Sequence, residues 1–140
     1  MRIAVGSDER SSLTDRVVRD LEDRGHEVVL IGALAGSPLE WADAGRAVAM
    51  EVAEGHAACG IGFCWTGTGF SIAANKVPGV RAALCTDSET ARGARKWNDA
   101  NVLVMSLRLT SEEIAHEILD AWFTQEPEDD QAEQIAKATG

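Results

Sequence analysis

Short apolar segments alternate with segments of helical periodicity along the chain, and this alternation limits the folds open to it. Five segments predict strands, at residues 1–5, 27–31, 59–63, 80–85 and 101–105, and helices are predicted at 13–25, 41–54, 70–75, 88–96 and 111–123. Strands that alternate with helices form a parallel sheet covered on both faces, with right-handed crossovers. The sequence therefore predicts a doubly wound, Rossmann-like α/β sandwich of three layers around a five-stranded parallel sheet. Its length of 140 residues predicts one domain, 1–140.

The protein is strongly acidic, with a formal net charge of -10. Nucleic acid is an unsuitable partner, because binding to the phosphate backbone needs clustered Lys and Arg. The opening apolar run is too short for a signal peptide and no segment is long enough to cross a membrane, so we expect a cytoplasmic protein without a membrane partner. The three cysteines have no zinc-site spacing, which favours free thiols and no metal.

The segment Cys64–Gly69 is the main indication of function, because it joins a predicted strand to a predicted helix. Ligands of doubly wound folds bind at such carboxyl ends. The backbone amides of Trp65, Gly67, Thr68 and Gly69 would converge there with the helix N-terminus, an arrangement that stabilises negative charge. The spacing lacks the third glycine of a dinucleotide fingerprint and the lysine of a P-loop. Taken alone, it is equally consistent with a tight turn.

Cys64 lies at the mouth of this loop. A thiol beside a helix N-terminus ionises readily and becomes a base or nucleophile, and Thr66 is near enough in sequence to hydrogen-bond it. The alternative is a small buried residue, as most free cysteines are; that alternative fits Cys59 and Cys85 better. Asp8 follows the first predicted strand and so belongs to the same edge of the sheet.

Three segments together resemble one known family: Gly60–Cys85, Asn98–Leu103 and Arg2–Asp8. They are similar, in the same order and over nearly the whole chain, to the signature of the ribose-5-phosphate isomerase B and galactose-6-phosphate isomerase family. The resemblance implies an aldose–ketose isomerase that shifts a proton between adjacent carbons through a cis-enediolate. It also implies no metal or organic cofactor, and a homodimer or dimer of dimers with active sites shared between subunits.

The resemblance also implies roles for individual residues. The family's base falls on Cys64, its activating threonine on Thr66 and its anion hole on the amides of residues 65–69. Asp8 and Asn98 match positions that hold sugar oxygens. Arg108 matches a family arginine in the loop after the fifth strand.

Several positions depart from the family pattern where phosphate and ring opening are handled. Glu9 and Trp97 replace two histidines that serve these steps, and Asp130–Gln131 replaces a Gly-Arg pair whose arginine binds phosphate. A carboxylate repels phosphate, and loss of an arginine removes a bidentate ligand. Trp41 and Trp65 also replace family residues. With Trp97 they would narrow and dry the pocket, although for Trp97 a subunit interface is an equal alternative.

Three functions remain open. The first is an active isomerase with altered specificity, for an unphosphorylated sugar or a short or unusual sugar phosphate, in which Glu9 could take over ring opening. The second is ordinary ribose-5-phosphate isomerase activity, with phosphate held by Arg10 and Arg108, and with Arg81 or Arg92 as further candidates. The third is a non-catalytic sugar sensor on the same fold.

Overall fold

The computed structural model describes residues 1–140 and contains one five-stranded sheet in the order β2-β1-β3-β5-β4, in which all neighbouring strands are parallel. The strands are β1 (Arg2–Ser7), β2 (Glu27–Gly32), β3 (Cys59–Cys64), β4 (Ala82–Leu84) and β5 (Val102–Ser106). The order reverses after β2, because β3 pairs with the other side of β1. The predicted doubly wound fold is therefore confirmed.

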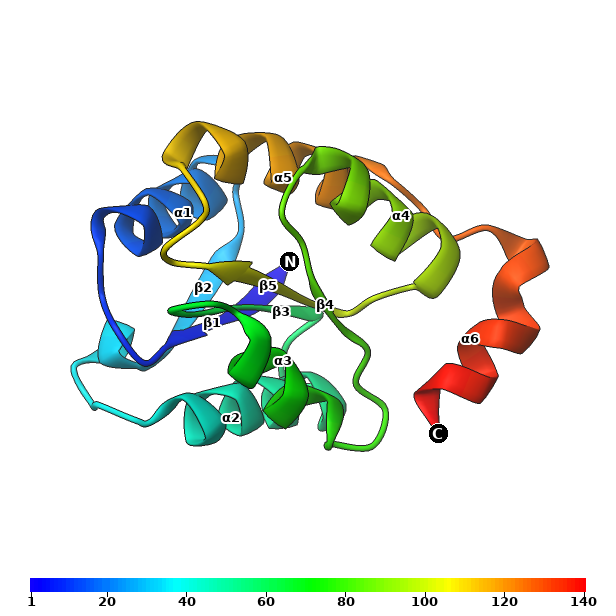
Figure 1. Cartoon of the computed structure of the whole chain (residues 1–140), viewed down its shortest axis with the longest axis horizontal. Helices are drawn as coiled ribbons and strands as arrows, with labels where there is room; N and C mark the ends of the chain where they lie inside the picture. Colours follow the sequence, from blue (N-terminus) through cyan, green and yellow to red (C-terminus); the bar gives the residue numbers. More distant parts are fainter.

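Helices cover both faces of the sheet (Figure 1). On one face lie α1 (Ser12–Asp23), α4 (Ser88–Asn98) and α5 (Glu112–Thr124), and on the other lie α2 (Trp41–Ala53) and α3 (Thr68–Asn75). Two short 3-10 turns, η1 (Ala33–Ala35) and η2 (Asp129–Gln131), and a final helix α6 (Ala132–Thr139) complete the chain. None of the helices is long and apolar enough to cross a membrane.

The two faces of the sheet are packed differently. The larger core places Ile3, Val5, Ile61, Phe63, Leu103 and Met105 against α1, α4 and α5. The smaller core lies under α2 and α3, where glycines let the helices approach the strands closely. A methyl group at Gly60 would lie 2.6 Å from Val48 of α2, and one at Gly62 would meet the ring of Phe70 from α3. The position of α3 therefore depends on a strand without a side chain at residue 62.

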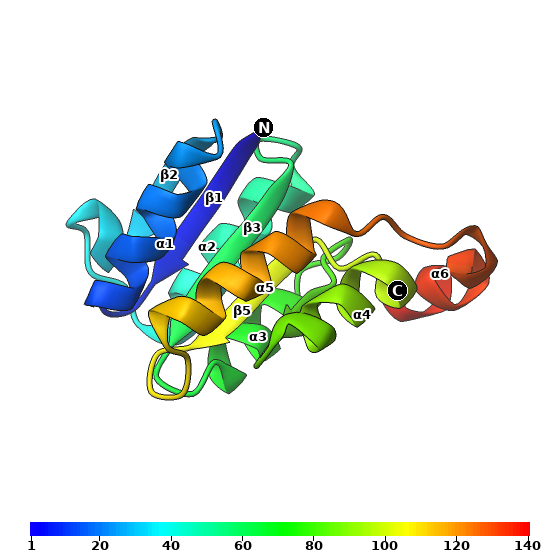
Figure 2. The ribbon, with the colours of Figure 1, turned by 90° about the horizontal axis from the view of Figure 1, so that it is seen from above.

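The chain beyond α5 forms an arm that projects from the body (Figure 2). The helix that ends this arm, α6, contains no buried residue. Lys96 Nζ pairs with Glu128 at 3.2 Å, and the backbone N–H of Glu128 donates to Lys96 O at 2.9 Å. These contacts tie the start of the arm to α4.

Candidate active site

The loop between β3 and α3 is held by the carboxyl end of β5. The backbone N–H groups of Leu107 and Arg108 donate to Cys64 O and Trp65 O, each at 3.0 Å, and the Ser106 hydroxyl donates to Trp65 O at 2.9 Å. Gly67 precedes α3 with φ +81°, a backbone conformation that favours glycine. No side chain caps α3, so the amides of its first turn have no side-chain partner. The loop is thus fixed with these donors available to an anion.

A cavity of about 360 Å³ opens beside this loop. It is lined by Asp8, Trp41, Cys64, Trp65, Thr66, Thr68, Gly69 and Ile72. The structure therefore brings together seven of the predicted site residues from the carboxyl ends of β1 and β3 and the start of α2. Ile72 was not predicted; it follows Thr68 by one helical turn, and that spacing was the available signal. The three free cysteines are all buried, and Cys64 is the one that lines this cavity.

The sequence placed Thr66 near enough to hydrogen-bond the Cys64 thiol, but its hydroxyl has a different partner. It lies 2.8 Å from the hydroxyl of Thr68, and the two form a hydrogen bond. Both hydroxyls line the cavity. Thr68 therefore contributes a side chain to the site as well as the predicted backbone amide.

The Asp8 side of the cavity is electrostatically negative. Burial raises the pKa of Asp8 above its usual value, and repulsion by the carboxylates of Glu9 and Glu40 raises it further. The Oδ1 atom of Asp8 is buried and has no hydrogen-bond partner in the chain. Glu9 itself is exposed and does not line the cavity. An anionic ligand group near Asp8 would meet three carboxylates.

Besides Glu9 and Gly67, three predicted site residues do not line this cavity. Asn98, the last residue of α4, lines a separate cavity of about 320 Å³ beside Arg81 and the arm. The exposed ring of Trp97 lies against Gly93 of the same helix, and Lys96 Nζ lies 5.4 Å from the ring centroid. Arg108 is exposed at the loop after β5. One chain therefore does not gather every predicted residue around one ligand.

Most of the arginines considered for phosphate are already occupied. Three of the four are paired with carboxylates of the same chain: Arg10 with Asp15 at 2.9 Å, Arg81 with Asp99 at 3.5 Å, and Arg92 with Glu89. Arg10 also lines a different cavity, of about 330 Å³, between α1 and β2. Of these four arginines, Arg108 alone makes no ion pair, and its backbone N–H is bonded to the loop of the candidate site.

Two asparagines in the segments that resemble the family bind backbone groups of the same chain. Asn75 exchanges two hydrogen bonds with the backbone of Ala82, at 2.8 and 3.0 Å. Asn101 accepts from Arg81 N at 2.7 Å and donates to Gly79 O at 3.0 Å. Both therefore hold the segment that leads into β4.

A thiol, two hydroxyls, a carboxyl group and uncapped helix amides around one cavity at the carboxyl edge of a parallel sheet form a candidate active site whose groups suit proton transfer. A family model described as Ribose/Galactose Isomerase matches residues 3–138. The chain belongs to this family, as the sequence predicted, and is an enzyme of the isomerase class.

Similar proteins cover nearly the whole chain. Ribose-5-phosphate isomerase B of Escherichia coli (strain K12) is 36% identical over 138 residues, which is 98% of this chain and 93% of that protein. D-erythrulose-4-phosphate isomerase of Pectobacterium atrosepticum is 34% identical and covers 90% of this chain and 84% of its own length. The solved structure of Clostridium thermocellum ribose-5-phosphate isomerase B is 39% identical, with a TM-score of 0.91 over 98% of this chain and 94% of that chain.

Proposed function

We propose that this protein is a cytoplasmic aldose–ketose isomerase for a small sugar, with specificity altered away from ribose 5-phosphate. The observation that carries the proposal is the single cavity lined by Cys64, Thr66, Thr68 and Asp8 beside the uncapped start of α3. Base, hydroxyls and anion-binding amides are the groups that an enediolate mechanism needs. The altered specificity is supported by the charge around Asp8 and by the scarcity of free arginines.

The proposed reaction is a proton shift between two adjacent carbons. The Cys64 thiolate removes the proton from the hydroxyl-bearing carbon beside the carbonyl, and the electron pair forms a carbon–carbon double bond while the carbonyl oxygen becomes an oxyanion. Amides of residues 65–69 donate hydrogen bonds to this oxyanion. Cys64 then delivers a proton to the neighbouring carbon, and while a proton is held on the thiol it exchanges with solvent. The hydroxyl proton moves to the other oxygen, a transfer for which Asp8 and the Thr66 hydroxyl are the nearest candidates. No atom is gained or lost.

Charge is the argument for altered specificity. A phosphate carries nearly two negative charges at neutral pH, and Asp8, Glu9 and Glu40 would repel it. The arginine of the family's Gly-Arg pair is Gln131 here, in η2. A sugar without a phosphate avoids this repulsion. One relative is named for a four-carbon substrate, D-erythrulose 4-phosphate, which indicates that the family accommodates short chains.

We further infer a homodimer, alone or paired into a tetramer, with shared active sites. Trp41, Trp65 and Ile72 expose 46%, 59% and 60% of their surface next to the cavity, an apolar group that a second subunit would bury. Asn98 and Trp97 would then reach the cavity of the partner rather than that of their own chain. This arrangement accounts for their distance from Cys64 within one subunit.

An ordinary ribose-5-phosphate isomerase is the alternative that one observation favours. Arg108 is exposed, makes no ion pair and is fastened to Trp65 O through its backbone. A single arginine could hold a phosphate at the cavity mouth. An Arg108→Gln variant tests this: in the ordinary isomerase it raises the KM for the sugar phosphate only.

The deciding experiment measures, by NMR, solvent deuterium entering the carbon next to the carbonyl. The panel pairs tetroses, pentoses and hexoses with and without phosphate. Cys64→Ala is the test variant, and Cys85→Ala, at a buried cysteine outside the cavity, is the matched control. Exchange abolished only by Cys64→Ala supports the isomerase, and the preferred sugar decides between the two specificities. Binding without exchange on every sugar would reject the isomerase in favour of a sensor.

Shared sites have a separate test. Cys64→Ala subunits, expected to be inactive, and Asn98→Ala subunits, expected to keep a small measurable activity, are mixed after mild dissociation. If sites are shared, hybrid dimers regain up to about half of the activity, because one of their two sites has both residues. No recovery in verified hybrids would reject sharing.

A further inference from the structure

We propose that Asp99 is a positioning residue of the active site: its left-handed backbone and its two arginine partners set the direction of Asn98. The inference rests on the proposed function, in which Asn98 contacts the sugar bound by the partner subunit. Asp99 itself would touch no substrate.

The backbone of Asp99 is unusual. It has φ +46° and ψ +46°, and it is the only residue other than glycine with a positive φ in the chain. L-residues seldom adopt this conformation, although Asp tolerates it better than most. The turn is closed by hydrogen bonds from Asp99 N to Arg95 O at 3.3 Å and from Ala100 N to Ala94 O at 3.0 Å. It stops α4 at Asn98 and sends the chain back into β5.

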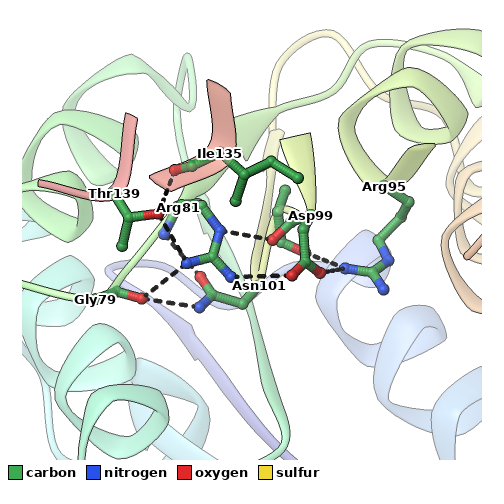
Figure 3. Close-up of polar contacts among 8 residues, drawn as sticks. Gly79, Arg81, Arg95, Asp99, Asn101, Ile135 and Thr139 are labelled. Atoms are coloured by element: carbon green, nitrogen blue, oxygen red, sulfur yellow. Dashed lines mark hydrogen bonds and ion pairs between the residues drawn. The ribbon is translucent and has the colours of Figure 1, made fainter. Parts of the chain in front are cut away.

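Two arginines hold Asp99 from both sides (Figure 3). Arg95 Nη1 binds Asp99 Oδ1 at 3.0 Å and also donates to Ala100 O at 2.7 Å. Arg81 donates through Nε to the backbone oxygen of Asp99 at 2.8 Å, and its Nη2 lies 3.5 Å from Oδ2. The arginine side chains are only 18% and 19% exposed, so water screens these contacts weakly. Side chain and backbone of the turn are thus both fixed.

Asn98 ends α4 directly before this turn, and no side-chain hydrogen bond of its own holds it in place. Its side chain is exposed and makes no hydrogen bond within the chain, whereas Asn75 and Asn101 nearby are both bonded to backbone groups. Its amide is therefore free for a ligand, and its direction follows from the backbone that Asp99 shapes. Arg81 also donates to the Thr139 hydroxyl at 3.2 Å, so the same network includes the arm (Figure 3).

The test is a double-mutant cycle measured as kcat/KM on the best sugar of the exchange panel. Asp99→Asn keeps the side-chain shape and the tolerance of positive φ but removes the charge that the arginines bind. Because misplacing a substrate contact by about 1 Å costs up to about 100-fold, we expect Asp99→Asn to lower kcat/KM about tenfold. In an Asn98→Ala background the same change should cost less than about twofold, since the group that Asp99 positions is gone.

An equal loss in both backgrounds would overturn the inference and leave Asp99 a structural residue. Glu89→Gln is the matched control, because it also removes a carboxylate paired with an arginine on α4, and it should leave kcat/KM unchanged. Asp99→Gly, which permits the backbone but has no carboxylate, should resemble Asp99→Asn.

A second readout does not depend on activity. The backbone amide of Asn98, observed by 15N NMR in the intact protein, should be ordered in the wild type and more mobile in Asp99→Asn. If no sugar is turned over, the proposed function fails, yet this measurement still decides whether Asp99 orders Asn98. Unchanged order of the Asn98 amide would reject the positioning role.

Discussion

Gly62→Ala tests how tightly the active-site helix depends on the sheet beneath it. An added methyl group would lie within 2.7 Å of three ring atoms of Phe70, where ordinary contacts are about 3.5 Å or more. Phe70 is fully buried, so the ring cannot turn into solvent and α3 must move by on the order of 1 Å. Overpacking of this kind lowers the free energy of unfolding by about 1–3 kcal/mol. Because the buried ring of Phe70 cannot move aside, we expect a loss of about 3 kcal/mol for Gly62→Ala.

The expected melting temperature follows from the entropy of unfolding. At about 2.1 cal/mol/K per residue, 140 residues give about 0.3 kcal/mol/K, so about 3 kcal/mol lowers Tm by about 10 °C. Activity should fall further than stability explains, because α3 begins at the loop proposed to bind the oxyanion. Calorimetry and deuterium exchange measure the two effects, and Phe70→Leu in the Gly62→Ala background should recover much of the lost Tm. A Tm within about 2 °C of wild type, or no recovery with Phe70→Leu, would refute the reasoning.

Two further predictions concern other contacts. Arg24→Met removes the partner bound to Asp20 Oδ1 at 2.6 Å, and we expect a loss of about 2 kcal/mol, less than for a fully buried pair because Arg24 is 20% exposed. Burial alone would raise the pKa of Asp20, but hydrogen bonds from Arg24 and His116 outweigh burial and hold this pKa below 3.8. The stabilisation by the Asp20–Arg24 pair is therefore complete above pH 3.8 and is lost as pH falls through the lower pKa of the folded state. Urea titrations should show the difference between wild type and variant shrinking in that acid range; a constant difference would contradict the assignment. Thr68→Val removes the hydroxyl bonded to Thr66 and should lower kcat about tenfold at unchanged KM. Thr68→Ser should restore it, and an unchanged exchange rate at saturating sugar would show that the contact has no role.

The fold was predictable because its signals are local. Each predicted strand overlaps an observed one, since buried parallel strands are short, continuous apolar runs. The fourth was predicted too long: residues 80–85 contain a ladder of only Ala82–Leu84. At the start of this strand, the backbone N–H groups of Ala82 and Arg81 donate to the side chains of Asn75 and Asn101. Periodicity in the sequence does not reveal such side-chain contacts.

The site was predictable in part, for a physical reason. Residues that follow strands at one edge of a parallel sheet must converge, and so Asp8 and the loop after β3 share a cavity. The pairing of Arg10 with Asp15, or of Thr66 with Thr68, depends on rotamers, and sequence spacing leaves several partners open. The packing of the Trp97 ring against Gly93 also depends on a side-chain rotamer, so the sequence did not predict it.

The division between backbone and side-chain groups explains how such a site could change substrate and keep its chemistry. The proposed anion hole is made of amides, which every residue except proline supplies, so Trp65 and Thr68 can vary without removing a donor. The resemblance in sequence instead assigns phosphate binding to arginine and histidine side chains, and Glu9 and Gln131 occupy two of those positions in this chain. If this is correct, Glu9→His should restore affinity for a sugar phosphate by lowering KM while leaving the rate of Cys64-dependent exchange on an unphosphorylated sugar unchanged. A fall in that exchange rate would mean that Glu9 takes part in the proton transfers themselves.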